Sequence, residues 1–271
     1  MTGWIAPLLA QGAQEEEEGF HAPEIGEFFP APIFFDGTIF HFTRIHLVMV
    51  VMTLLTCAFF IAAFRKPQIV PRGVQNLGEL AIEFVRVQII DEVIGSAGRR
   101  FLPYLTTLFW FVFALNIAGI IPFLNISGSS VIGLPLMLAL ISWLMFNYEG
   151  IREQGVGPYL RGNLFPPGVP APIYVLVTPI EFVSTFILRP VTLTIRLLAN
   201  MLAGHLLLVL FFSATSYLLL DASGPLKIFS VASFGMGFIF TLFEILVAFL
   251  QAYIFALLTA VYIGGALAPD H

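Results

Sequence analysis

Charge is scarce in this sequence. Only 11% of the 271 residues are charged, against roughly a quarter in an average soluble domain. Hydrophobic residues make up 58% of the chain, and the mean hydropathy is +0.94. This composition predicts an all-α integral membrane protein rather than a soluble domain. The net charge of −5 comes largely from the acidic run 15–18, so it indicates no nucleic-acid partner.

Cysteine and nucleotide-binding motifs are also nearly absent. The single Cys57 lies in an apolar run, which excludes an internal disulfide and indicates no metal site. No phosphate-binding Gly-Lys-Ser/Thr loop occurs, so we expect no directly bound nucleotide and no cofactor. Neither a basic signal-peptide start nor an Arg-rich transit segment precedes the apolar regions. We therefore expect a bacterial plasma membrane location.

Five segments are long and apolar enough to cross a bilayer, which takes about 20 residues. They should form a single helix, a hairpin and a long tilted hairpin, at 46–64, 102–123, 131–148, 173–220 and 226–267. Pro179 and Pro190 predict bends in the fourth segment, and two short helices are the alternative there. We expect 1–40 to be an acidic, proline-containing tail and 41–271 a single transmembrane domain.

Two polar stretches lie between these spans. Residues 74–97 have helical periodicity but too many charges to span, which predicts an amphipathic helix on the membrane surface. Residues 149–170 are charged and rich in proline and glycine, and should form an aqueous loop. Eight Lys and Arg residues fall on one side of the membrane, and Arg44 and Lys227 on the other. The N-terminus is therefore expected outside and the C-terminus in the cytoplasm.

The last two spans contain costly polar groups. An arginine at membrane depth is a functional candidate by default, and Arg196 is too deep to reach an interface easily. At 100° per residue, one stripe on its helix carries Thr178, Glu181, Thr185, Arg189, Thr192, Arg196 and Asn200. His205 falls on the opposite face. Glu244, Gln251 and Tyr262 share a face of the final helix.

A hairpin that turns at 223–224 sets the depths of these groups. It places Arg196 level with Gln251, and His205 level with Glu244 about 12 Å further along. No carboxylate shares the depth of Arg196, because Glu181 lies about four turns away. We therefore expect its partner to be a carboxylate on another chain. Two purely structural alternatives exist. Arg196 could form a static ion pair, and His205 and Glu244 could simply satisfy each other's polar groups.

Several motifs in this region form a family pattern. A proline and a Thr-rich turn precede Arg196, and Asn200-Met-Leu-Ala-Gly-His205 follows it. This closely resembles the signature of subunit a of F-type ATP synthases. Asn116 with Pro122, Glu181 within Pro-x-Glu-x-x-Ser, and the stretch from Gln251 to Thr259 extend the resemblance over most of the chain. Leu198-Ala199 departs from the usual residues without touching a polar position.

The resemblance implies a function and a set of roles. Such a subunit conducts protons through two half-channels to and from the carboxylates of a rotating c-ring, which couples proton flow to ATP synthesis. Arg196 would face the ring, with Gln251 orienting its guanidinium. The outer half-channel would use His205, Glu244, Asn200 and Asn116; the inner one would use Glu181, with Ser184 and Thr185 as weaker candidates.

The implied partners are the c-ring subunits, the peripheral-stalk b subunits and membrane lipid. Catalysis would take place in a distant head, so the chain is not expected to be an enzyme on its own. A self-contained secondary transporter that binds an anion through Arg196 is the alternative. The over-long final helices and the lack of an evident internal repeat weigh against it. A haem anchor would need two deep histidines, whereas His46 lies at a helix end.

Overall fold

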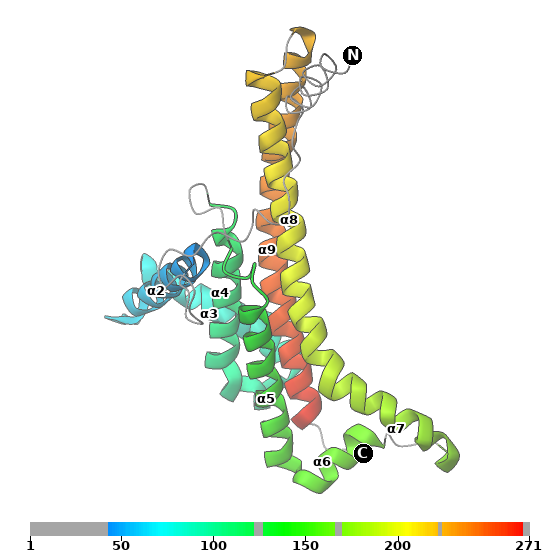
Figure 1. The fold of residues 1–271 in the computed structure, drawn as a ribbon. Coiled ribbons are helices and arrows are strands. Elements are labelled where there is room, and N and C mark those ends of the chain that lie inside the picture. The colour runs from blue at the N-terminus through cyan, green and yellow to red at the C-terminus, as the bar shows by residue number, and fades with distance from the viewer. Residues whose placement is uncertain (1–42, 122–126, 166–169, 222–223, 268–271) are drawn as a thin grey trace, which may run out of the picture. The chain divides into compact units, whose positions relative to one another are not determined.

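The computed structural model describes residues 43–121, 127–165, 170–221 and 224–267, and the regular elements in these ranges are all helical. Helices long and apolar enough to cross a membrane lie at Arg44–Phe64, Gly95–Ala118, Gly133–Gln154, Tyr174–Leu220 and Gly224–Leu267 (Figure 1). The predicted all-α class with five membrane helices is confirmed. Among the described residues, 206–242 form one compact unit, and 43–205 with 243–267 form another. The expected tail at 1–40 lies outside the described residues.

The first two helices cross closely. Helix α2 (Arg44–Phe64) is followed by α3 (Val74–Val85). Gly73 directly precedes α3 and has φ of +57°, a backbone conformation that residues other than glycine rarely adopt. Gly78 lies against α2, because a Cβ atom there would be only 2.6 Å from the Cβ atom of Ala63. The missing side chain therefore allows α3 to pack tightly on the end of α2.

The predicted surface helix is amphipathic, but it does not lie on a surface along its whole length. Leu77 and Leu80 are exposed in α3, as expected of a face in contact with lipid. The continuation, a π-helical segment at Arg86–Asp91, carries Ile89 and Ile90, which are completely buried in the main core. The stretch therefore begins as an amphipathic helix and ends inside the protein.

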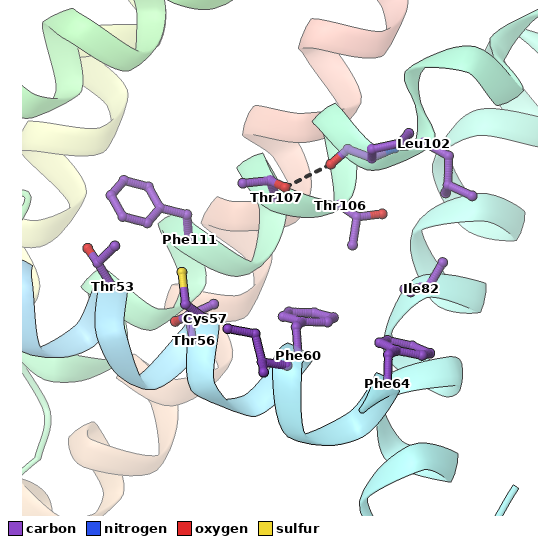
Figure 2. Close-up of a pocket in the computed structure, with 12 residues that line it drawn as sticks. Thr53, Thr56, Cys57, Phe60, Phe64, Ile82, Leu102, Thr106, Thr107 and Phe111 are labelled. Carbon is purple, nitrogen blue, oxygen red and sulfur yellow. Dashed lines mark hydrogen bonds between the residues drawn. The ribbon is translucent and has the colours of Figure 1, made fainter. Parts of the chain in front are cut away.

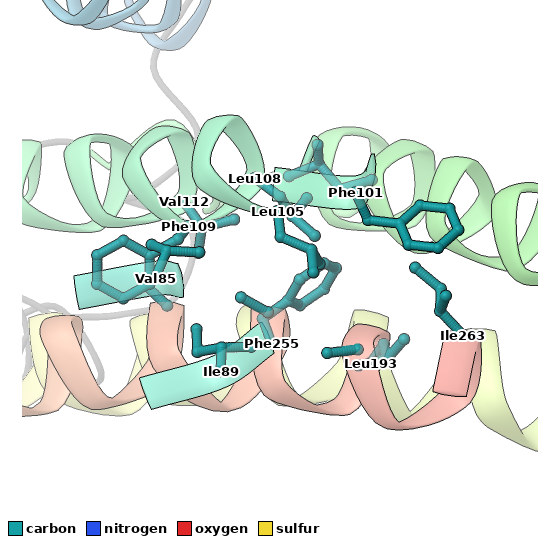
Figure 3. Packing of buried hydrophobic residues seen from close by; sticks show 14 of the residues in the cluster. Val85, Ile89, Phe101, Leu105, Leu108, Phe109, Val112, Leu193, Phe255 and Ile263 are labelled. Atoms are coloured by element: carbon teal, nitrogen blue, oxygen red, sulfur yellow. The ribbon is translucent and has the colours of Figure 1, made fainter. Parts of the chain in front are cut away.

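The main core joins α4 (Leu102–Ala118), α5 (Gly133–Gln154) and the C-terminal part of α9 (Ile228–Leu267). Figure 3 shows Phe109 of α4 and Phe255 of α9 within this cluster. Burial of apolar surface gives little driving force inside a bilayer, so close packing must hold the helices together. Small residues at every fourth position of α9 provide it, all completely buried: Ala252, Ala256 and Ala260.

A serine-rich turn connects α4 to α5. The Oγ of Ser127 donates a hydrogen bond to the carbonyl oxygen of Leu115 (2.8 Å), and the Oγ of Ser130 donates to the carbonyl oxygen of Ser127 (2.8 Å). The first bond satisfies a carbonyl group that the end of α4 would otherwise leave unpaired, and the second stabilises the turn itself. Helix α4 ends at Ala118, before the predicted end at 123, and Pro122 lies outside the described residues.

The prediction of a loop at 149–170 is wrong for residues 149–164, which are almost entirely helical. Helix α5 continues to Gln154, and α6 (Val156–Leu164) follows after a turn at Gly155, whose φ is +86°. The charges that suggested a loop are used in pairing: Arg100 contacts the buried Glu149 at 3.2 Å and Glu153 at 2.7 Å. Residues 166–169 of the predicted loop lie outside the described residues.

The Arg100 cluster provides a test of stability. Replacing Arg100 with Ala should lower the free energy of unfolding by about 1–3 kcal/mol, because it leaves the buried carboxylate of Glu149 with only the longer contact to Arg152, at 3.6 Å. The exposure of Arg100 (41%) keeps the expected loss below that of a fully buried pair. Thermal unfolding of the purified chain in detergent measures the effect. Arg99→Ala is the matched control, since Arg99 is 68% exposed and its contact with Asp91 is long, at 3.8 Å. Equal melting temperatures for both variants would contradict the account.

A large apolar cavity lies between α2, α3 and α4. Its volume is about 690 Å³, and its lining includes Cys57 and Phe64 of α2, Ile82 of α3 and Phe111 of α4 (Figure 2). The hydroxyl of Thr107 faces this space but donates to the backbone oxygen of Pro103 (2.8 Å). The cavity therefore offers apolar surface and few available polar groups.

The fourth span is one continuous helical stretch, Tyr174–Leu220. Of the two predicted alternatives, the single bent helix is therefore correct, and the two short helices are not. Helix α7 (Tyr174–Phe182) leads through a π-helical segment at Val183–Leu188 into α8 (Arg189–Leu220). The wide π turn stands directly before Pro190, which cannot donate a backbone hydrogen bond to the preceding turn. The irregularity therefore falls where the sequence predicts a bend.

Candidate functional site

The face of α8 that carries Arg196 points away from the main core. Leu193 and Leu197 are each 1% exposed and belong to the core cluster, whereas Thr192, Ile195 and Arg196 are exposed. Within the part of the chain that the structure describes, Arg196 forms no ion pair. The charge of Arg196, which is energetically costly at membrane depth, therefore points outward from an apolar helix. No carboxylate of the described residues pairs with it.

One close contact sets the register of α8 against α9. A Cβ atom built on Gly204 would lie 2.6 Å from Oε1 of Glu244, so the carboxylate occupies space that only glycine leaves open. His205, the next residue, is 4% exposed, and Glu244 is half-buried. The Oε2 atom of Glu244 is buried and has no hydrogen-bond partner among the described residues. A buried histidine and a carboxylate therefore lie at one level of the two helices.

A second contact between α8 and α9 lies nearer the N-terminal end of α8. The guanidinium carbon of Arg189 lies 5.0 Å from the ring centre of Tyr262 and 5.9 Å from that of Phe146. Such geometry is a cation–π interaction. The sequence placed Arg189 in the stripe and Tyr262 on the Glu244 face, but did not predict that they meet. In the predicted hairpin their depths differ by only about one helical turn, and this was the available signal.

Gln251 lies between these two contacts on α9, as Arg196 does on α8. Glu244 precedes Gln251 by about two helical turns, and Gly204 follows Arg196 by about the same distance. Gln251 is 5% exposed, and its Nε2 atom has no hydrogen-bond partner within the described ranges. The two bracketing contacts therefore agree with the predicted register, in which Gln251 and Arg196 share one depth.

Asn116 is held by the turn after α4. Its Oδ1 accepts a hydrogen bond from Oγ of Ser129 at 2.8 Å, and Oγ of Ser129 lies 2.9 Å from Oγ of Ser127. The side chain is buried, and its Nδ2 atom is unpaired in the described part of the chain. The asparagine is therefore held in place through its oxygen, while its amide nitrogen remains available to donate to a polar group.

The positions before α8 do not follow the straight helical wheel. Thr178 and Glu181 precede the π-helical segment, whose wider turns advance less than 100° per residue. Their predicted angles relative to Arg196 are therefore wrong, although their order along the helix holds. Glu181 and Ser184 are half-buried, whereas Thr185 is 1% exposed and its hydroxyl is unpaired among the described residues.

Helix α6 contributes a buried tyrosine that was not among the residues predicted from the sequence. Tyr159 is buried, and its hydroxyl donates to Oδ1 of Asn147 at 3.0 Å. Burial raises the pKa of Tyr159, while the positive charge of Arg189 acts in the opposite direction. Tyr159 therefore remains neutral at physiological pH and belongs to the surroundings of Arg189.

No group of three or more His, Cys, Asp and Glu side chains in the described residues is arranged to hold a metal ion. What the last two helices do assemble is a set of polar groups on otherwise apolar helices: the exposed Arg196 of α8, the buried Gln251 of α9, and the His205–Glu244 level. These features define a polytopic membrane protein with a charged intramembrane site.

The particular family follows from comparison with known proteins. The family model described as ATP synthase A chain matches residues 46–264. Proteins named ATP synthase subunit a are 53% identical over 252 residues in Rhodococcus erythropolis (93% of this chain, 92% of the relative) and 46% over 255 residues in Parafrankia (93% and 85%). A third, from Frankia alni, is 42% identical over 273 residues (99% and 91%). The chain belongs to the ATP synthase subunit a family.

Proposed function

We propose that this chain is the proton-conducting stator subunit of a bacterial F-type ATP synthase. In this proposal it assembles with a c-ring and with peripheral-stalk b subunits. Protons reach the ring carboxylates through one half-channel and leave through another, and rotation of the ring carries the energy to a distant catalytic head. A proton gains about 2.3 kcal/mol per 100 mV of membrane potential along this path.

The observation that carries the proposal is the outward position of Arg196. An exposed arginine on an intramembrane helix, without an ion pair in the described chain, favours a partner carboxylate from outside. A passing ring carboxylate beside the guanidinium is favoured in its deprotonated form. The same charge keeps a proton from passing directly between the half-channels. Gln251, at the same depth, would orient the guanidinium.

The other polar groups supply the two paths. His205 and Glu244, with Asn200 and Asn116, would form the outer half-channel. Glu181, with Ser184 and Thr185, would form the inner one. Buried polar atoms that have no hydrogen-bond partner among the described residues support these assignments, because a proton path needs donors and acceptors that are still unused: Asn116 Nδ2, Thr185 Oγ1 and Glu244 Oε2. A histidine beside a carboxylate favours protons over sodium, since histidine titrates near neutral pH.

The proposed topology places the N-terminus outside and the C-terminus in the cytoplasm. The support is the distribution of Lys and Arg between the spans. The competing anion transporter would enclose its substrate arginine in a cavity within the bundle. Arg196 instead shares an exposed face with Thr192 and Ile195, which favours contact with another subunit.

Cross-linking to the ring tests the proposal directly. Cys57 is first replaced by Ser, since it is exposed. A cysteine at Ile195, which is 54% exposed beside Arg196, should then form an oxidative cross-link with a cysteine placed near the ring carboxylate of the intact complex. Thr194→Cys is the matched control, because Thr194 is 3% exposed on the core side. Equal cross-linking of both positions, or of neither, would contradict the proposed interface.

A further inference from the structure

A second cavity lies at the C-terminal end of α2 and has a different chemical character. Its volume is about 570 Å³, and three of the residues that line it are cations: Arg65, Lys66 and Arg72. The remaining lining comes from the last turn of α2, from Gln68 in the connecting loop and from the first residues of α3, including the amide side chain of Gln75. The cavity therefore combines concentrated positive charge with hydrogen-bonding groups.

These three cations are available to a ligand. All three are exposed, and none forms an ion pair within the ranges that the structure describes. The acidic side chain of Glu79 lies near, but it accepts a hydrogen bond from Nε2 of Gln75 at 2.7 Å. Other arginines of the region, such as Arg86, already contact carboxylates. The positive charge at the end of α2 is thus left for a partner.

A buried amide holds the loop that carries the cations. Gln75 is 8% exposed, accepts a hydrogen bond from the backbone nitrogen of Gln68 (3.0 Å) and donates one to the backbone oxygen of the same residue (2.9 Å). This pair of hydrogen bonds ties the middle of the loop to α3. The close crossing of Gly78 and Ala63 fixes the two helices that the loop connects. Specific contacts therefore hold the walls of the cavity in place.

The surroundings of the cavity match the boundary of a bilayer. The apolar span of α2 ends at Phe64, immediately before Arg65. Ile69 and Val70, in the same loop as the cations, are 103% and 65% exposed. Exposed aliphatic side chains beside cations are typical of segments that insert into the interface and neutralise anionic headgroups. Phe64 also lines the larger apolar cavity between α2, α3 and α4 (Figure 2).

We propose that this cavity binds the headgroup phosphate of an anionic phospholipid. Arg65, Lys66 and Arg72 contact the phosphate, while Ile69 and Val70 lie among the acyl chains. Inorganic phosphate offers similar anionic oxygens but no apolar part, so it would leave the exposed aliphatic residues in water. The observations therefore favour a lipid, and the site would anchor α2 and α3 at the membrane boundary. This inference does not depend on the proposed proton path.

Lipid titration of the full-length chain tests the site. The chain is delipidated in detergent, and binding of phosphatidylglycerol is compared with phosphatidylcholine of the same acyl composition by native mass spectrometry. The double variant R65Q/R72Q should weaken binding of phosphatidylglycerol by about tenfold or more, since each basic side chain near an anionic surface contributes to binding. The variant R99Q/R161Q removes the same charge elsewhere and should bind as the unaltered chain does.

Further arms separate the possible outcomes. R65K/R72K keeps the charge and should restore most of the binding, which also guards against a folding defect of the glutamine variant. I69S should weaken binding of the lipid but not of inorganic phosphate. Equal binding of both lipids, equal losses in R65Q/R72Q and R99Q/R161Q, or displacement of the lipid by millimolar inorganic phosphate would each overturn the proposal.

Discussion

Replacing Arg196 with Ala should abolish ATP synthesis driven by an imposed proton gradient. A nearby opposite charge lowers the pKa of a carboxyl group by about 1–3 units, so its loss should slow release of the proton from each ring carboxylate by about ten- to a thousandfold. Arg196 has no ion pair within the described part of its own chain, so little loss of stability is expected from the change. Synthesis is measured in inverted membrane vesicles that contain the complete complex.

Two further variants define what the charge does. Arg99→Ala removes an exposed arginine outside the proposed path and should leave synthesis near the unaltered rate. Arg196→Lys keeps a positive charge but loses the planar guanidinium, so we expect a strong but smaller defect. The vesicles should also be tested for passive proton flow with the catalytic head removed. Substantial synthesis by the Arg196→Ala complex would refute the proposed mechanism.

The pairing of the last two helices could be predicted from the sequence because few geometries are open to it. Two uninterrupted helices joined by a short turn have essentially one register, which the positions of Ser223 and Gly224 suggest. The contacts of Gly204 with Glu244 and of Arg189 with Tyr262 agree with that register within about one turn. Composition likewise sufficed for the all-α class, since only helices satisfy the backbone of such spans internally.

Long-range pairing explains where local patterns failed. Glu149 looked like a loop residue because its charge was counted as a solvent signal. Its partner, Arg100, lies about fifty residues earlier, and no local pattern reveals that the two meet. The ion pair between the partly exposed Arg100 and the buried Glu149 allows α5 to extend beyond the predicted end of the span. The π-helical segment at Val183–Leu188 was missed for a related reason, because the wheel assumed one helical period on both sides of Pro190.

The sequence suggests which residues are candidates for the site, but not which surface they share. The sequence indicates which polar groups share a depth, because helical rise is regular. It does not show which face of α8 packs into the core. Leu193 and Leu197 decide that by their burial, and Arg196 is consequently directed outward. Arg196 lies on an exposed face and has no ion-pair partner among the described residues. For this reason we propose that this face is a subunit interface.

Gly204→Ala should separate the function of Glu244 from its contribution to folding. The added Cβ atom would meet Oε1 of Glu244 at 2.6 Å, so the carboxylate has to move. Because this atom is the far end of a flexible side chain, we expect the chain to fold and assemble normally. Proton transfer requires close alignment, and a displacement of about 1 Å in a reacting group can cost on the order of a hundredfold in rate. Passive proton flow through head-depleted vesicles should therefore fall by at least about tenfold.

The decisive comparison uses one control and one rescue. Gly265→Ala places the same methyl group on α9 where nothing lies within 4 Å, so its proton flow should be unchanged. In the Gly204→Ala background, Glu244→Asp shortens the acidic side chain and makes room for the methyl group. The double variant should conduct faster than Gly204→Ala alone. If it conducts more slowly than either single variant, the contact between Gly204 and Glu244 is not what limits proton flow, and His205 with its neighbours would have to carry the proton without that carboxylate.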